Sequence, residues 1–261
     1  MTSPSDKNTD VPIRDASTVV LLRDGDSGLE VWMLTRVTAM VFAGGFTVFP
    51  GGRVDDADAE LPFVTDAEAL TARRYGCDAT MARMLVGAAI RETFEETGVL
   101  LSTPPADLAA ARGDVEAGRV SFGELLRTNL LKLDADALRP WSRWVTPRGE
   151  ARRYDTRFFV GGLPAEALAA DVTTESSHAD WFGIHEALDI GQRGERRMLP
   201  PTLATLASLT EFSTVADVLA ASEQRNLDPI RPTVSEGPDG YRAELPDGTS
   251  FVIPRSLFGS D

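Results

Sequence analysis

Several residue types that define protein classes are scarce in this chain of 261 residues. A single cysteine, Cys77, excludes an intrachain disulfide and a cysteine-based metal site, and it predicts a reducing, cytoplasmic location. The two histidines, His178 and His185, lack the spacing of a metal site. No apolar run is long enough to span a bilayer, and residues 1–14 are polar, which predicts a flexible N-terminus without a targeting peptide.

Positive charge is scarce as well. The chain has 26 lysines and arginines against 40 acidic residues, a net charge of -14. Binding to nucleic-acid backbones needs clustered positive charge, so a nucleic-acid partner is excluded. An anionic small molecule would need a divalent cation and a few well-placed arginines. The apolar share of 43% is enough to fill a core.

Strand and helix patterns interleave along the chain, which predicts an α/β (α+β) fold with a curved sheet between helices. Period-two patterns and turn residues predict strands at residues 17–24, 29–36, 46–49, 144–147, 153–160, 241–245 and 250–253. The first two and the last two of these form hairpins. Capping signals and apolar spacing predict helices from Asp78 or Thr80 to Gly98, from Ser121 to about 133, and over 201–212 and 215–221.

The helix that ends at Gly98 carries an unusual acidic face. Glu92, Glu95 and Glu96 share one side of it, whereas Ile90 and Phe94 lie nearly opposite. A solvated acidic surface is the plain alternative. Hard oxygen ligands of this kind suit Mg²⁺ or Mn²⁺.

Two features of the context favour a metal site over a solvated surface. Upstream, Phe49-Pro50-Gly51-Gly52 is a strand end where glycine lets a backbone carbonyl turn toward a cation. Arg91, next to the glutamates, can hydrogen-bond a neighbouring carboxylate and hold its orientation.

Together these segments resemble the Nudix box, whose pattern is Gly, five residues, Glu, seven residues, then Arg-Glu-aliphatic-x-Glu-Glu-x-Gly-aliphatic. Thr93 replaces an aliphatic residue, and Asp58 stands in place of the first glutamate. An insertion of 25 residues, about 59–83, separates Asp58 from Arg91 and is expected to cover or border the active site. The resemblance implies a single Nudix domain over 15–258, with a C-terminal extension of helices and a hairpin over about 195–258.

The resemblance also implies a metal-dependent hydrolase that cleaves a diphosphate in a small nucleotide-derived substrate. Its catalytic group is Arg91, Glu92, Glu95 and Glu96, and its metal ligands are these three glutamates and a carbonyl at Gly52, binding Mg²⁺ or Mn²⁺. The general base stays open. Glu175 is an outlying ligand or base, or else a solvated side chain. Asp58 is a further candidate, or only a turn residue.

A box interrupted in this way resembles the acyl-coenzyme A diphosphatases, which would release 3′,5′-ADP and (acyl-)4′-phosphopantetheine. Arg36, Gly45 and the run from Phe49 to Gly52 fit the coenzyme A signature, whereas Val41 stands where a second arginine is expected. The predicted substrate-binding residues are Arg36, Gly51, Arg152 and Arg153. Two alternatives stay open: a Nudix pyrophosphatase for ADP-ribose, a dinucleotide or a nucleoside triphosphate, and a non-catalytic ligand-sensing module. No membrane partner is expected, and a homodimer is left open.

Overall fold

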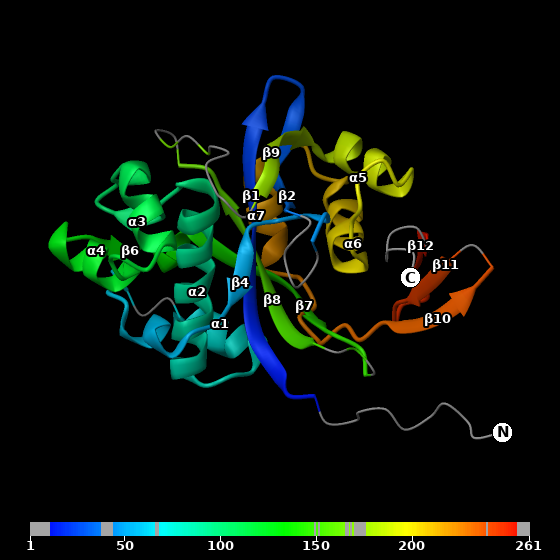
Figure 1. The fold of residues 1–261 in the computed structure, drawn as a ribbon, viewed down its shortest axis with the longest axis horizontal. Coiled ribbons are helices and arrows are strands. Elements are labelled where there is room, and N and C mark those ends of the chain that lie inside the picture. Colours follow the sequence, from blue (N-terminus) through cyan, green and yellow to red (C-terminus); the bar gives the residue numbers. More distant parts are fainter. Residues whose placement is uncertain are drawn as a thin grey trace.

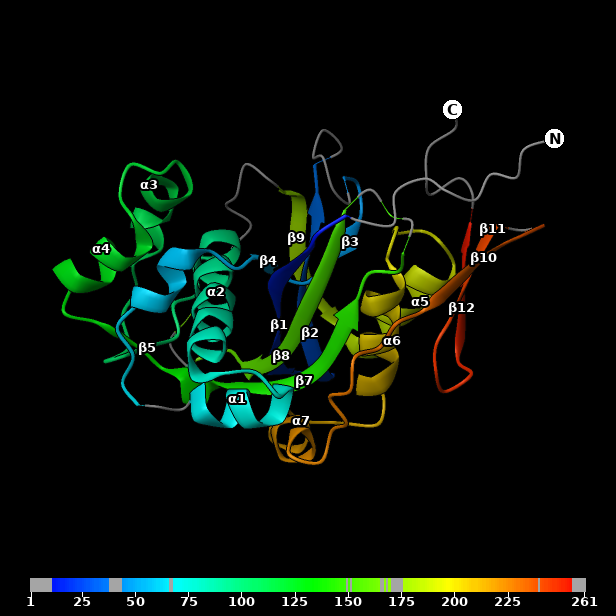
Figure 2. The same ribbon diagram turned by 90° about the horizontal axis from the view of Figure 1, so that it is seen from below.

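The computed structural model describes residues 11–37, 44–65, 68–148, 150, 152–164, 167, 169, 176–238 and 240–254. At its centre is a curved, mixed seven-stranded sheet (Figures 1 and 2). β1 pairs in parallel with β8, and the other pairs in this sheet are antiparallel. The strands are β1 (Ile13–Gly25), β2 (Gly28–Arg36), β3 (Thr47–Val48), β4 (Gly51–Arg53), β7 (Leu138–Val145), β8 (Arg153–Gly162) and β9 (Ser176–Gly183).

Helices cover both faces of this sheet, as the sequence predicts. In Figure 1, α2 (Ala79–Thr97) lies on one side, and α5 (Ile184–Gln192) and α6 (Pro200–Leu209) lie on the other. β2 shows why its sequence is continuously apolar: Trp32 and Leu34 join the core under α2, whereas Val31 and Met33 join the core under α5 and α6. No helix among the described residues has the length and apolar character to cross a membrane.

The boundaries of α2 confirm the predicted helix. Asp78 caps its start, with the side chain accepting a hydrogen bond from the Met81 N–H at 2.7 Å. Gly98 ends it in the left-handed region, at a φ of 77° that favours glycine. Ser17 of β1 donates to the Leu85 carbonyl at 2.7 Å, which fixes the helix on the sheet.

Three predicted boundaries are wrong. The helix that starts at Ser121 is α4 (Phe122–Thr128), and the buried leucines after it lead into β6 (Lys132–Leu133), which pairs with β5 (Ser102–Thr103). The strand expected from residue 144 starts at Leu138, because β7 lies at a sheet edge and has a bulge where Pro140 is tolerated. β1 begins at Ile13, inside the segment expected to be flexible.

Several elements have no clear pattern in the sequence. β9 is polar because much of it is exposed, and it adds to the outside of β2. The predicted terminal hairpin gains a third strand. Three further elements match predicted segments: α7 (Val215–Ser222), β11 (Gly240–Glu244) and β12 (Ser250–Pro254). The others are η1 (Asp56–Glu60), α1 (Glu68–Tyr75), η2 (Ala109–Ala111), α3 (Arg112–Glu116), η3 (Ala135–Ala137) and β10 (Thr233–Gly237).

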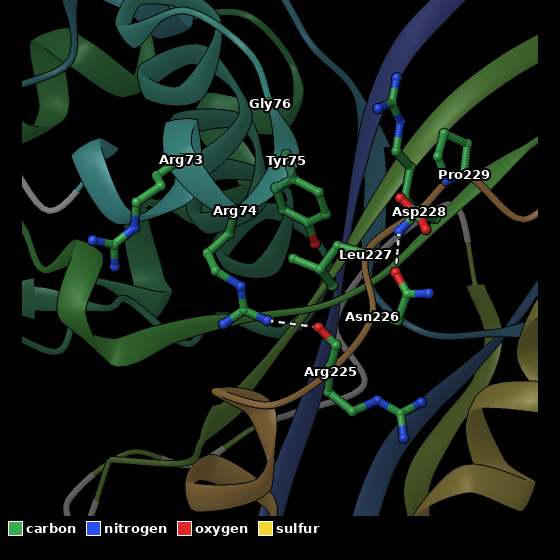
Figure 3. Close-up of a pocket in the computed structure, with 10 residues that line it drawn as sticks. Arg73, Arg74, Tyr75, Gly76, Arg225, Asn226, Leu227, Asp228 and Pro229 are labelled. Atoms are coloured by element: carbon green, nitrogen blue, oxygen red, sulfur yellow. Dashed lines mark hydrogen bonds between the residues drawn. The ribbon is translucent and has the colours of Figure 1, made fainter.

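The described part of the inserted segment packs mainly in the core beside α2. Of the two expected roles, covering or bordering the carboxylates, its start has the second. Its helix α1 packs beside the start of α2, and from Ala79 to Glu92 an α-helix rises about 20 Å. Arg74 donates to the carbonyls of Ser222 (3.0 Å) and Arg225 (2.9 Å), the second of which is drawn in Figure 3. Among the described residues, the carboxylate face is bordered by η1, which holds Asp58 of the box and the first residues of the insertion.

Tyr75 is the main polar anchor of α1, and its replacement by phenylalanine should destabilise the fold. The hydroxyl is buried and lies 2.6 Å from the Phe158 carbonyl, to which it donates, and 3.2 Å from the Ser142 carbonyl. Burial raises the pKa of Tyr75 far above its usual range, so the donor proton stays on the oxygen at all working pH values. Urea unfolding should show a loss of about 1–2 kcal/mol with an unchanged m-value. A loss below about 0.5 kcal/mol would show that the hydrogen bond is unimportant.

Candidate active site

The acidic face predicted for the carboxylate helix is present in α2. Ile90 and Phe94 are completely buried on the core side. Glu92 and Glu95 are partly exposed, whereas Glu96 is 5% exposed. Carboxylates this close repel one another, so the fold must supply positive charge or donors among them.

The two glycines after β3 bring backbone against two of these glutamates. The Gly51 N–H donates to Oε2 of Glu96 at 2.8 Å. A side-chain carbon at Gly52 would lie 2.3 Å from Oε1 of Glu92, and one at Gly51 would lie 2.5 Å from the Ser17 carbonyl. Gly51 therefore requires glycine, because a side chain there would meet the backbone of β1, whereas a side chain at Gly52 would displace the Glu92 carboxylate. In this structure the Gly51 N–H binds a carboxylate.

Arg91 supplies the positive charge, and Asp58 holds it in place. Its guanidinium lies 2.7 Å from Oε1 of Glu92 and 3.4 Å from Oε2 of Glu95. It donates to both carboxylate oxygens of Asp58, at 2.8 and 3.1 Å. Asp58 is 1% exposed and also accepts from the Asp55 N–H at 2.9 Å. Asp58 is therefore a turn residue and an ion-pair partner at once, in the position where the box pattern has its first glutamate.

Two further arginines complete the surroundings. Arg36, at the end of β2, has a guanidinium nitrogen 3.7 Å from Oε1 of Glu96. This contact places it beside the carboxylates, where its predicted role in substrate binding needs it. Arg112 of α3 donates to the main-chain carbonyl of Glu95 at 2.7 Å and is almost fully buried. The sequence did not point to Arg112, because no local motif connects α3 with the end of α2.

Burial raises the pKa of Glu95 to about 7, with the charge of Glu92 as the next cause and Arg91 acting in the opposite direction. Burial alone would lower the pKa of Arg91, but its hydrogen bond to Asp58 and the charge of Glu92 raise it above the ordinary value. Arg91 therefore stays charged, while Glu95 changes charge near neutral pH.

The shifted pKa predicts that replacing Glu95 with glutamine stabilises the metal-free protein above pH 7. The folded state binds the Glu95 proton more tightly than the unfolded state, so stability falls as the pH rises from about 4.5 to about 7. Glutamine removes this loss. In EDTA, the variant should match the parent near pH 4.5 and exceed it by roughly 1–3 kcal/mol at pH 8. Parallel curves of unfolding free energy against pH would contradict the shift.

The structure does not bring the other predicted arginines to the carboxylates. Arg152 is exposed, and Arg153 donates to the carbonyls of Thr146 and Pro147 at the turn between β7 and β8. Arg153 pairs with Ile13 of β1, whereas Gly52 pairs four residues further along that strand, about 13 Å away. Glu175 and Val41 lie outside the described residues.

The donor types at this face fit a hard divalent cation, because three carboxylates and a glycine backbone meet there. Within the described ranges, however, no group of three or more histidine, cysteine, aspartate or glutamate side chains is arranged to hold a metal ion. The glutamates are instead engaged by Arg91, Arg36 and the Gly51 N–H. The ligand atoms at this face are therefore of the kind that a divalent cation prefers, but in this structure the carboxylates are arranged around arginines.

A cavity of about 300 Å³ lies elsewhere, between α1 and the segment after α7 (Figure 3). None of the predicted site residues lines it. The guanidinium groups of Arg73 and Arg225 point away from each other in Figure 3, and that of Arg74 is bound to main-chain carbonyls. This cavity belongs to the packing of the insertion and not to the carboxylate site.

Comparison with known proteins matches residues 77–209, just over half of the chain, to the family described as the NUDT19 Nudix domain. The chain is 24% identical to "Acyl-coenzyme A diphosphatase NUDT19" of Xenopus laevis over 285 residues, covering 91% of this chain and 75% of that protein. It is 29% identical to "Putative nudix hydrolase 7" of Caenorhabditis elegans over 189 residues, or 70% of this chain. It spans 56% of the length of that relative.

A solved structure agrees with these matches. A nudix hydrolase from Alicyclobacillus acidocaldarius superposes with a TM-score of 0.69 at 28% identity, and the match covers 84% of this chain and 99% of that one. The sheet and its covering helices are therefore those of a Nudix fold. The chain belongs to the NUDT19 Nudix domain family of Nudix hydrolases.

Proposed function

We propose that this chain hydrolyses the diphosphate of coenzyme A or an acyl-coenzyme A in a divalent-cation-dependent reaction, giving 3′,5′-ADP and (acyl-)4′-phosphopantetheine. The observation that carries the proposal is the carboxylate face of α2 packed against the Gly51–Gly52 backbone. The choice of substrate rests on the name of the Xenopus laevis relative and on Arg36, Gly45 and the Phe-Pro-Gly-Gly run of this chain.

In this proposal Glu92, Glu95 and Glu96, with the Gly52 carbonyl, hold Mg²⁺ or Mn²⁺. When bound, the cation neutralises diphosphate charge and lowers the pKa of a water molecule. Arg91 orients Glu92 and Glu95, and Asp58 keeps Arg91 from turning away. Arg36 lies beside Glu96 and can place its planar guanidinium against the diphosphate oxygens. Burial raises the pKa of Glu95 to about 7 in the metal-free protein, and a bound cation favours its charged form, so cation binding near neutral pH should release a proton.

A hydrolysis panel tests the proposal. Coenzyme A, an acyl-coenzyme A, ADP-ribose, a diadenosine polyphosphate and a nucleoside triphosphate are incubated with Mg²⁺ or Mn²⁺, and the products are separated by chromatography. Release of 3′,5′-ADP from the coenzyme A substrates, abolished by EDTA, is the expected result. Turnover of ADP-ribose alone would replace the substrate assignment. Binding without turnover of any compound would identify a ligand-sensing module.

A further inference from the structure

A pair of arginines stands at the same end of the sheet as the carboxylate site, on the segment between α5 and α6. Arg196 donates to Oγ1 of Thr35 at 3.0 Å, and the carbonyl of Arg197 accepts from the Thr47 N–H at 2.7 Å. The hydroxyls of Thr35 and Thr47 lie 2.9 Å apart. The segment is therefore fixed to the ends of β2 and β3, one residue from Arg36.

Both guanidinium groups are supported by aromatic rings. The Arg196 guanidinium carbon lies 5.0 Å from the centre of the Phe182 ring, and that of Arg197 lies 4.7 Å from the centre of the Phe46 ring. Such contacts orient a guanidinium without cancelling its charge. Nε of Arg197 is buried and has no hydrogen-bond partner among the described residues.

In the described part of the chain these arginines also have no acidic partners. Among the residues that the structure describes, no carboxylate forms an ion pair with Arg196 or Arg197, whereas Arg193 nearby pairs with Glu195 at 2.6 Å. The chain has 40 acidic residues for 26 basic ones, so acidic side chains are plentiful. Two adjacent, half-buried arginines without carboxylates in such a protein indicate a place for an external anion.

We propose that Arg196 and Arg197 bind a phosphate monoester of the substrate, the 3′-phosphate of the adenosine in coenzyme A. Thr35 and Arg36 are consecutive on β2, at a register shift in its pairing with β9, and their side chains make contacts on opposite faces of the sheet. Arg36 reaches Glu96 on one face, and Thr35 holds Arg196 on the other. A nucleotide lying across the end of the sheet would place its diphosphate at Arg36 and its 3′-phosphate at Arg196 and Arg197. This inference rests on the proposed function and adds a subsite to it.

Calorimetric titration of the full chain in EDTA tests the subsite without relying on turnover. The probes are 3′,5′-ADP, 5′-ADP and inorganic phosphate. The parent should bind 3′,5′-ADP at least tenfold more tightly than 5′-ADP, and the double variant R196Q/R197Q should lose that preference. Arg193→Gln, on the same segment and outside the subsite, should keep it. Arg196→Lys and Arg197→Lys retain the charge and should retain part of the preference, which keeps the test valid if the double variant does not fold.

The outcomes separate the two proposals. Equal affinity of the parent for 3′,5′-ADP and 5′-ADP, or an unchanged preference in R196Q/R197Q, overturns the subsite. Binding of inorganic phosphate as tight as that of 3′,5′-ADP also overturns it, because the arginines would then hold any free phosphate. A preference for 3′,5′-ADP that depends on Arg196 and Arg197 supports the subsite even if coenzyme A is not hydrolysed, and such a result counts against the proposed function alone.

If the protein hydrolyses coenzyme A, kinetics gives a second measurement. The ratio of kcat/KM for coenzyme A over kcat/KM for dephospho-coenzyme A should fall at least tenfold in R196Q/R197Q.

Discussion

Replacing Glu96 with glutamine is expected to lower kcat about 10²- to 10⁴-fold. Glu96 is the most buried of the three glutamates, and it is the one bound by the Gly51 N–H and approached by Arg36. Glutamine keeps the size and can still accept from Gly51, but it has no charge for a divalent cation. Turnover of the substrate found in the hydrolysis panel is measured at saturating Mg²⁺.

The control for this variant is Glu186→Gln, which changes an exposed glutamate in the first turn of α5. It should retain the parental rate. Thermal unfolding of the Glu96 variant should occur within a few degrees of the parent. Glutamine has the same length and nearly the same size as glutamate, so the packing around it is kept. A rate within a factor of three of the parent would refute the assignment of Glu96 to the catalytic site.

Replacing Asp58 with alanine should lower the free energy of unfolding by about 3 kcal/mol. The change removes the two hydrogen bonds that Arg91 donates to Asp58. The Arg91 side chain is only 12% exposed, so its guanidinium is left in a buried place without its main acidic partner. It also removes the acceptor for the Asp55 N–H. Urea unfolding measures the loss, and the activity should fall as well, because Arg91 then no longer holds Glu92 and Glu95 in one orientation.

Asp55→Ala is the matched control. Its carboxylate is 62% exposed and lies 3.8 Å from the same guanidinium, and it also caps η1, so the expected change is about 1 kcal/mol or less. Similar losses for the two aspartates would mean that the buried pair is not specifically stabilising. An Asp58 variant with parental stability and activity would show that Asp58 is only a turn residue.

The sequence predicts well the parts of the site that depend on near neighbours. Spacing on one helix is enough to put Glu92, Glu95 and Glu96 on one face, and Asp78 and Gly98 carry local capping chemistry at its ends. Gly51 and Gly52 are recognisable because two glycines that directly follow a predicted strand and a proline indicate a place where the backbone itself comes close to other groups. The mixed sheet between helices follows from the interleaved patterns.

The rest depends on contacts between segments distant in the chain. Arg112 reaches the end of α2, and Arg196 reaches β2, through hydrogen bonds that no local pattern reveals. Arg153 was expected near substrate because arginines suit phosphate, but its Nε donates to carbonyls of its own turn, away from the carboxylates. The inserted segment was expected to cover or border the site; its start at η1 borders the carboxylates, whereas Tyr75 attaches α1 to β8 through a contact that no local pattern reveals.

The contacts of Arg74 with the end of α7 have a consequence for where this structural unit can be cut. The family match stops at residue 209, yet Val218, Leu227 and Leu245 beyond it are buried in the same cores as the sheet. A chain truncated after Leu209 would expose apolar surface on β7 and β8 and remove the carbonyls that Arg74 binds. A fragment that keeps these buried contacts therefore extends beyond the matched range, to at least Leu245.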